Sequence, residues 1–498
     1  MHCQPLLVAG PRAEPGRDTG RRSVPASVSC LLAATLACAA ALAPESARAS
    51  GNYTHVRVAT HALDFLDAGA LKDLLSRPEL LQMLRNGAMF PDGGYAVDDG
   101  YGEIAHWEPF QRVYLEWIRS HYQPPWSDEA AQHIAFLMGM AAHGLTDQLF
   151  DGMFLERAGY HDGNARSPVF GGIDGLTDAC FALAMGDMDA PQPWVPAKTL
   201  APLFGEASGH TVTAATIDKG QTLVPVAILY AQDRAHNAAT MKEAMDTHPW
   251  ACGRVDDASV PGSPPAIPPV VGRYWAVLWA RLNGADTFDQ PLLGTFFADT
   301  LPCEVPLDAA SPDSWVSFAM PRGLDPATVG PQSVRVEDAS GAAIPVQAHV
   351  YYGKHSHLVN LKPAADWSPG TLYSVTLAVP MSSWEGIALA AERRFTFGTP
   401  PAPGAPYEDS DGTLSCVIPG GLAETVAGDD LSSAEPGPGR SGSSSQGSCA
   451  VAGPQSVPGA SRLPLLLLAL LALLAAPLAT RFFPLRARSD IAVVLPRN

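Results

Sequence analysis

Residues 135–151, AFLMGMAAHGLTDQLFD, decide how the N-terminal half of this chain must fold. Residues 134–142 are apolar on nearly every side of a helix, and a helix of that kind is buried in the centre of a domain. His143 and Asp147 follow four residues apart, so their side chains share one helix face. A buried carboxylate needs a partner, and a metal ion is a natural one.

Helical periodicity extends to both sides of this stretch. Apolar residues recur every three or four positions across 61–87, and Ser127 followed by two acidic residues is typical of a helix start. Residues 270–284 predict a further helix that is closed by Gly284. We therefore expect an all-α domain over 50–303.

Three short stretches before the buried helix carry further metal-ligand side chains. They are THVRVATHALDFL, NGAMFPDGGY and GEIAHWEPF, with His55, Asp92 and His106. Imidazole nitrogens and carboxylate oxygens suit zinc, and a metal site of this kind activates water against phosphate esters. Each residue alone has an ordinary structural explanation, but together with His143 and Asp147 they predict a metal site.

The stretch 53–178 resembles the zinc-dependent phospholipase C domain, which also forms the N-terminal part of glycosylphosphatidylinositol-specific phospholipase D. The phrases THVRVATHALDFL, AMFPDGGY, AHWEPF, HYQPPW and AFLMGMAAHGLTD follow the order of that family. Fungal single-strand nucleases share its fold and metal cluster. The resemblance implies a helical bundle that holds three zinc ions and hydrolyses phosphodiesters.

The resemblance also assigns ligands. One metal would be held by the aspartate of FPD, the histidine of HW and the HxxxD pair, which are Asp92, His106, His143 and Asp147. A second metal would take His55 and the α-amine of Ser50, if cleavage makes Ser50 the first residue, with Asp147 as a bridge. Asp92 would also be the general base.

The third metal is where this chain departs from the family pattern. Asp151 stands where the family has a histidine, and Asp174 and Asp178 are spaced as DxxxD. Either these carboxylates rebuild the site for Zn²⁺, Mn²⁺, Mg²⁺ or Ca²⁺, or the site is lost and two metals remain. Asp174 and Asp178 would then be surface residues. His143, Asp147 and Asp151 share one helix face, which favours the rebuilt site.

The pattern changes at about residue 304. Six short β-rich runs with turn signals occupy 304–399 and predict a small all-β sandwich. The phrases LDPATV, SVRVEDASG, LKP, SPGTLYSVTL and RFTFGT resemble the bacterial Ig-like domains of surface proteins. His355 and His357 would lie on one face of an exposed strand.

The N-terminus reads as a secretory signal peptide over 1–49. Two arginines precede an apolar run, and Ala47-Arg48-Ala49 is a small-x-small cleavage site. Cys38 offers a rival lipoprotein site. An oxidising compartment permits disulfides, and Cys252 with Cys303 is the predicted pair.

The C-terminal residues predict a membrane anchor. Residues 400–462 are a Pro-, Gly- and Ser-rich disordered linker, 463–480 are an apolar transmembrane helix, and 481–498 are a basic tail that should stay cytoplasmic. The segment around Cys449 resembles the C-terminal sorting tails of myxobacterial surface proteins. By that resemblance, processing machinery would cleave the tail near Cys449 and the protein would move to the cell surface.

The whole chain of 498 residues therefore predicts a multidomain protein, with an all-α metal domain, a small Ig-like sandwich and a C-terminal membrane helix. The expected function is that of an exported, surface-tethered phosphodiesterase acting on phospholipids or glycolipids. A nuclease of the same fold is one alternative, although the net charge of −18 argues against a stable nucleic-acid partner. A catalytically degenerate protein for display or adhesion is the other.

Overall fold

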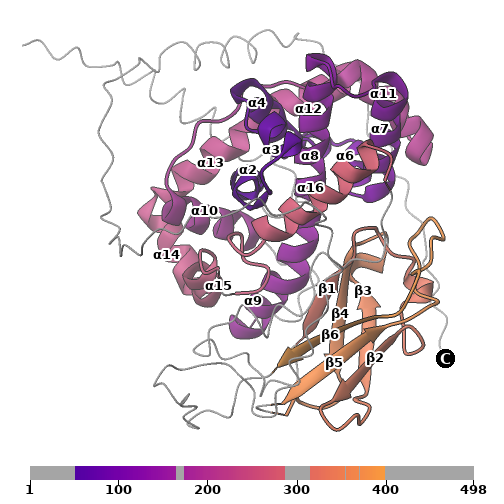
Figure 1. Ribbon diagram of the computed structural model, residues 1–498. Coiled ribbons are helices and arrows are strands. Elements are labelled where there is room, and N and C mark those ends of the chain that lie inside the picture. Colours follow the sequence, from indigo (N-terminus) through magenta and orange to yellow (C-terminus); the bar gives the residue numbers. More distant parts are fainter. Residues whose placement is uncertain are drawn as a thin grey trace, which may run out of the picture. The chain divides into compact units, whose positions relative to one another are not determined.

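The computed structural model describes residues 51–163, 173–285 except 259, and 315–398 except 354, 369 and 370. These residues form a helical part and a smaller part of antiparallel strands (Figure 1). The predicted signal peptide, Ser50, the domain boundary at 303/304, the linker, the C-terminal helix and the basic tail lie outside them. No helix in the described ranges is long and apolar enough to cross a membrane.

The helical part consists of α-helices. In chain order they are α2 (Asn52–His61), α3 (Ala70–Leu75), α4 (Pro78–Gly87), α5 (Asp92–Ala96), α6 (Tyr101–Ala105), α7 (Glu108–His121), α8 (Asp128–Leu149), α9 (Glu156–His161), α10 (Ile173–Met185), α11 (Ala197–Ser208), α12 (Ala214–Leu223), α13 (Pro225–Ala235), α14 (Ala238–Thr247), α15 (Pro249–Arg254) and α16 (Pro268–Leu282). A 3₁₀-helix, Ala62–Phe65, follows α2, and a π-helix, Phe150–Leu155, continues α8.

Helix α8 is the central element of the helical part, as predicted. The Ser127 hydroxyl accepts a hydrogen bond from the Ala130 N–H at 3.2 Å, which caps the first turn. Every residue from His133 to Leu149 is buried. Helices α2, α4, α7 and α16 pack against α8 (Figure 1).

Two glycines of α8 allow other backbone segments to approach it very closely. A Cβ atom on Gly139 would lie 2.0 Å from the Leu84 carbonyl oxygen of α4, and one on Gly144 would lie 2.1 Å from the His106 carbonyl oxygen. Any side chain at these positions would displace the neighbouring backbone. The glycines therefore bring the end of α4 and the His106 segment onto the middle of α8.

The helical periodicity predicted over 61–87 is confirmed, and it covers the 3₁₀-helix, α3 and α4. Proline disfavours helical backbone in the residue before it, and Arg77, before Pro78, is extended with ψ 130°. The end of α16 follows the prediction, because Gly284 has φ 90° and the Ala285 N–H donates to the Ala280 carbonyl at 2.9 Å.

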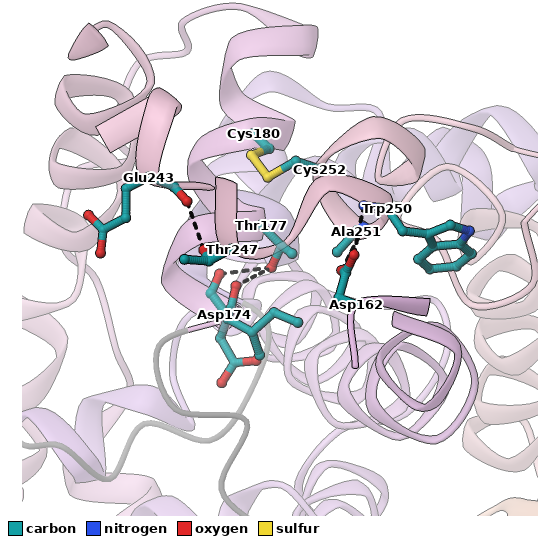
Figure 2. Close-up of a disulfide and its surroundings, with 10 residues drawn as sticks. Asp162, Asp174, Thr177, Cys180, Glu243, Thr247, Trp250, Ala251 and Cys252 are labelled. Atoms are coloured by element: carbon teal, nitrogen blue, oxygen red, sulfur yellow. Dashed lines mark hydrogen bonds between the residues drawn. A yellow bond between two sulfur atoms is a disulfide. The ribbon is translucent and has the colours of Figure 1, made fainter. Parts of the chain in front are cut away.

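The predicted disulfide between Cys252 and Cys303 is wrong. Cys252 of α15 is bonded instead to Cys180 of α10, with 5.4 Å between their Cα atoms (Figure 2). The partner depends on how two helices 72 residues apart in sequence pack together, which composition does not reveal. The bond ties α15 to the helix that carries Asp174 and Asp178.

All six predicted β-runs contain strands. They are β1 (Val316–Ala319), β2 (Val334–Asp338), β3 (Val346–Val350), β4 (Leu358–Pro363), β5 (Leu372–Leu377) and β6 (Arg393–Gly398). They form two antiparallel three-stranded sheets, ordered β1-β4-β3 and β2-β5-β6. Val316 pairs with Leu361 in the first sheet, and Val334 pairs with Leu377 in the second. The rings of Phe318 on β1 and Phe395 on β6 lie 5.6 Å apart, so the two sheets share apolar contacts.

Glu108, at the start of α7, joins the helical part to the strands. Its carboxylate is 1% exposed and accepts hydrogen bonds from Arg281 Nη1 at 2.8 Å, the Gly323 N–H at 2.5 Å and Trp384 Nε1 at 3.0 Å. Burial opposes ionisation, but Arg281 and these donors outweigh it and hold the pKa of Glu108 below its usual value. A buried carboxylate, whose charge is balanced by Arg281, therefore links the helical part to the strands.

A second contact between the helical part and the strands corrects the prediction that His355 and His357 lie on an exposed strand. His357 is 2% exposed, and its Nδ1 donates to the Met320 carbonyl at 2.9 Å. The His357 N–H and the Ser356 hydroxyl both donate to Gln148 Oε1 of α8, at 2.7 and 2.8 Å. Ser356 and His357 therefore lie at an internal contact with α8 rather than on an exposed strand, and His355, just before them, is half-buried with φ 51°.

We predict that Glu108→Gln lowers the free energy of unfolding by about 3–5 kcal/mol, because it removes the charge that faces Arg281. A depressed carboxyl pKa stabilises the fold above the unfolded-state pKa near 4.5 and loses that contribution as the pH falls. Thermal melts from pH 3 to pH 7 should therefore show a smaller acid-induced loss in the variant than in the wild type.

Glu116→Gln is the matched control, since Glu116 lies on the same helix and pairs with Arg119 at the surface. It should change stability by less than about 1 kcal/mol. Equal stability losses in the two variants would contradict the role assigned to Glu108.

Candidate metal centre

Five side chains selected from the sequence meet inside the helical part. His55 comes from α2, Asp92 begins α5, His106 follows α6, and His143 and Asp147 lie one turn apart on α8. All five are buried. The fold thus brings together ligand-type groups from four separate segments.

The carboxylate of Asp147 lies at the centre of this group. Its Oδ1 is 3.0 Å from His55 Nε2, and its Oδ2 is 3.2 Å from His106 Nε2 and 3.3 Å from His143 Nε2. Asp92 Oδ1 is 3.9 and 3.8 Å from the same two imidazole nitrogens of His106 and His143. The rings of His55 and His143 stack with 3.6 Å between centroids.

Backbone carbonyls fix the proton positions on two of the imidazoles. His106 Nδ1 lies 2.6 Å from the Gly102 carbonyl oxygen, and His143 Nδ1 lies 2.7 Å from that of Ala88. A carbonyl oxygen only accepts, so each Nδ1 carries a proton, and each neutral ring presents a lone pair at Nε2. These two Nε2 atoms are 2.9 Å apart. Lone pairs at that distance, beside carboxylates, require a proton or a cation between them.

The charges of the ion-free centre follow from burial and from these contacts. Burial would lower the pKa of His106, but Asp147 and Asp92 outweigh it and raise the pKa to about 9. Burial and the neighbouring His55 lower the pKa of His143. The imidazoles hold the pKa of Asp147 well below its usual range, despite burial. A bound cation would take the place of the proton on His106.

The ligand atoms form two overlapping groups that could hold a metal ion. One group is His55, Asp92 and His143, and the other is His106, His143 and Asp147. Within each group the ligand atoms lie within 4.8 Å of one another. Imidazole nitrogen with carboxylate oxygen is the donor set that zinc prefers. The residues present therefore fit a divalent metal.

Asn52 belongs to this centre and was not selected from the sequence. Its Nδ2 donates to Asp92 Oδ2 at 2.9 Å, so the other oxygen, Oδ1, faces the imidazoles. Oδ1 of Asp92 is buried and has no hydrogen-bond partner among the described residues. Burial raises the pKa of Asp92. The signal was available, because Asn52 stands three residues before His55 and such residues share a helix face.

The other three predicted carboxylates are not part of either group. Asp151 lies in the π-helix after α8, and its Oδ2 accepts a hydrogen bond from the Tyr352 hydroxyl at 2.5 Å. Asp178 is buried rather than on the surface, and its Oδ1 accepts from the Thr54 N–H and hydroxyl at 2.9 and 2.7 Å. Burial raises the pKa of Asp178 to about 6. Burial and neighbouring carboxylates raise the pKa values of Asp151 and Asp174 well above normal.

The start of the described chain lies beside one of these carboxylates. A Cβ atom on Gly51 would lie 2.1 Å from Asp178 Oδ2, so the backbone before α2 runs directly past this acid. Ser50, the predicted amine ligand, lies outside the described residues. The ligand role of its α-amine therefore stays a prediction.

We predict that His143→Ala lowers the metal content of the purified protein by at least one ion per chain, because His143 belongs to both ligand groups. Elemental analysis after dialysis measures this. His236→Ala is the control, since His236 pairs with Asp187 at the surface, and it should keep the wild-type content. Equal metal content in both variants, with intact circular dichroism, would contradict a metal role for the centre.

Comparison with solved structures does not extend this description. The S-layer protein SbsC matches 68% of this chain and 47% of its own at 12% identity, with a TM-score of 0.17, and this likeness carries no argument. No family model matches the chain.

Comparison with curated sequences identifies relatives. Phosphatidylinositol-glycan-specific phospholipase D from Bos taurus is 26% identical over 181 residues, which are 32% of this chain and 21% of that protein. The Rattus norvegicus and Homo sapiens proteins are each 30% identical, over 118 and 120 residues, or 22% of this chain and 14% of theirs. The chain thus matches only a minor part of each relative's length. Over these residues the chain is distantly similar to phosphatidylinositol-glycan-specific phospholipase D.

Proposed function

We propose that this chain is an exported, surface-tethered, metal-dependent phosphodiesterase of the phospholipase C type, which hydrolyses phospholipid or glycolipid phosphodiesters. The observation that carries the proposal is the convergence of three imidazole nitrogens and two carboxylates on one buried point. The distant relationship to phosphatidylinositol-glycan-specific phospholipase D supports a hydrolase that acts on lipid phosphodiesters.

Zinc is the proposed metal, held by His55, Asp92, His106, His143 and Asp147. A divalent ion in this centre supplies Lewis acidity toward water and phosphate. The backbone carbonyls at Nδ1 of two imidazoles keep the Nε2 lone pairs directed inward, so these rings need no rearrangement to bind the ion.

Asp92 is the proposed general base. Asn52 holds its Oδ2, so Oδ1, which has no hydrogen-bond partner among the described residues, stays directed into the centre. Asp92 Oδ1 would accept the proton of the attacking water as the water oxygen bonds to phosphorus and the bond from phosphorus to the diacylglycerol oxygen breaks, and the released oxygen would take up a proton from solvent. Asp147, whose pKa is held low, stays ionised and keeps the negative charge of the ligand set.

Features at both ends of the sequence support export and tethering. The predicted signal peptide over 1–49 would direct export, and cleavage would create the α-amine of Ser50 as a further ligand beside His55. The apolar stretch 463–480 with its basic flank would hold the protein in the membrane until sorting machinery processes the tail.

Activity is tested with secreted protein in the presence of zinc, on vesicles of phosphatidylcholine with phosphatidylinositol. Cleavage of the C type releases a phosphorylated head group and leaves diacylglycerol, whereas cleavage of the D type leaves phosphatidic acid, so the lipid product identifies the bond broken. Asp92→Asn should lower kcat by about 10²–10⁴-fold, because the amide cannot accept the proton.

Asp64→Asn is the matched control, because Asp64 is exposed, and it should keep wild-type activity. Digestion of single-stranded DNA without lipid hydrolysis would assign the nuclease function instead. An inert protein that still binds metal would assign display or adhesion.

We further propose two ions per chain rather than three. Asp151, Asp174 and Asp178 belong to no ligand group among the described residues, and Asp151 and Asp178 each give one carboxylate oxygen to a hydrogen bond from Tyr352 or Thr54. Elemental analysis should therefore give two metals in both the wild type and Asp151→Ala. Three metals that fall to two on substitution would show that the carboxylates rebuild the third site, with Zn²⁺ or another divalent cation.

A further inference from the structure

We infer that Tyr352, from the strand region, forms part of the wall of the metal centre, where it positions Asp151 and contacts the substrate. This inference rests on the proposed phosphodiesterase function and deepens it. It gives the strand region a part in the reaction, beyond that of a spacer between the helical part and a membrane tether.

Tyr352 contacts residues that lie next to two of the ligand-type residues. Its hydroxyl donates to Asp151 Oδ2 at 2.5 Å, and Asp151 lies four residues after Asp147 on the continuation of α8. Its ring meets the ring of Trp107 edge to face, with 5.7 Å between centroids, and Trp107 directly follows His106. Tyr352 therefore bridges the segments that supply two of the ligand-type residues.

The ring of Tyr352 is still available to a ligand. The residue is 49% exposed, although its hydroxyl is engaged with a buried carboxylate. An aromatic side chain that is anchored at one end and open along its ring is suited to contact the organic part of a phosphodiester. We expect that organic part to pack against the exposed face of Tyr352.

The backbone of this segment is held in an unfavourable conformation. Tyr352 has φ 59° and His355 has φ 51°, and both values lie in the left-handed region that favours glycine. Non-glycine residues keep such conformations only where surrounding contacts impose them, and these positions cluster at functional sites.

The contacts that impose this conformation come from α8 and its continuation. A Cβ atom on Gly152 would lie 2.5 Å from Leu358 Cδ2 and 3.0 Å from the Tyr351 ring, so this glycine makes room for the segment. The Gly152 carbonyl accepts from Asn360 Nδ2 at 3.1 Å. Gln148 Oε1 accepts hydrogen bonds from the Ser356 hydroxyl and the His357 N–H, which follow Tyr352 in the chain. The same helical turns that present Asp147 and Asp151 therefore place Tyr352.

Hydroxyl-radical footprinting tests the inference without relying on activity. The zinc-loaded full chain is oxidised with and without two probes, inorganic phosphate and diethyl phosphate. Oxidation of Tyr352 should fall at least threefold with diethyl phosphate, whose ethyl groups would contact the ring, and should fall little with inorganic phosphate, which has no organic part. Tyr230, which is 48% exposed on α13, is the matched control and should be oxidised equally throughout. Equal oxidation of Tyr352 with and without diethyl phosphate would overturn the inference.

Two substitutions separate positioning from folding. Tyr352→Phe keeps the ring and removes the donor to Asp151, so it should lower kcat about tenfold and leave KM unchanged. Tyr352→Gly relieves the backbone strain, so it should melt at or above the wild-type temperature, yet raise KM and lower kcat. Wild-type kcat and KM in both variants would overturn the inference.

The outcomes distinguish this inference from the proposed function. If the protein hydrolyses no phosphodiester but the diethyl phosphate probe protects Tyr352 from oxidation, the proposed function is refuted and the inference about Tyr352 is supported. If the protein hydrolyses lipid but the diethyl phosphate probe does not protect Tyr352 from oxidation, the proposed function is supported and the inference about Tyr352 is refuted.

Discussion

An imidazole and a carboxylate stand in the middle of a helix that is buried on every side, and this constraint governs the rest of the structure. His143 and Asp147 cannot reach bulk water, so every charge and proton on them must be balanced by protein groups or by a cation. Gly144 brings the His106 segment onto α8, and the end of α4 supplies the carbonyl that orients His143. The close helix packing and the metal chemistry are therefore consequences of the same helix.

The strand region takes part in this arrangement and is not simply attached to it. Glu108 balances Arg281 at one joint, and Gln148 accepts two donors at the other. Gln148 follows Asp147 directly in sequence, so neighbouring residues of α8 serve the metal centre and the joint. A change that loosens the joint would disturb the centre as well, because both depend on the same helical turn.

The sequence predicted the parts of the fold that depend on local pattern. Periodicity and caps located α8 and the end of α16, alternating apolar runs located six strands, and ligand-type residues in ordered phrases located the five clustered side chains. Prediction from the sequence failed for contacts that depend on how segments far apart in the chain pack together. Cys180 was missed as the partner of Cys252, and the contacts of Asn52 and Tyr352 with Asp92 and Asp151 depend on the tertiary fold.

The disulfide also affects how the acidic residues of α10 are held in place. It joins α10 to α15 (Figure 2), and α10 also carries Asp174 and the Asp178 that lies beside the start of the described chain. In a reducing compartment this helix would be held by packing alone, with its acidic residues repelling one another. The disulfide holds the helix against that repulsion. Opening the bond with a reductant would therefore loosen the hold on these buried acids without changing any ligand-type side chain.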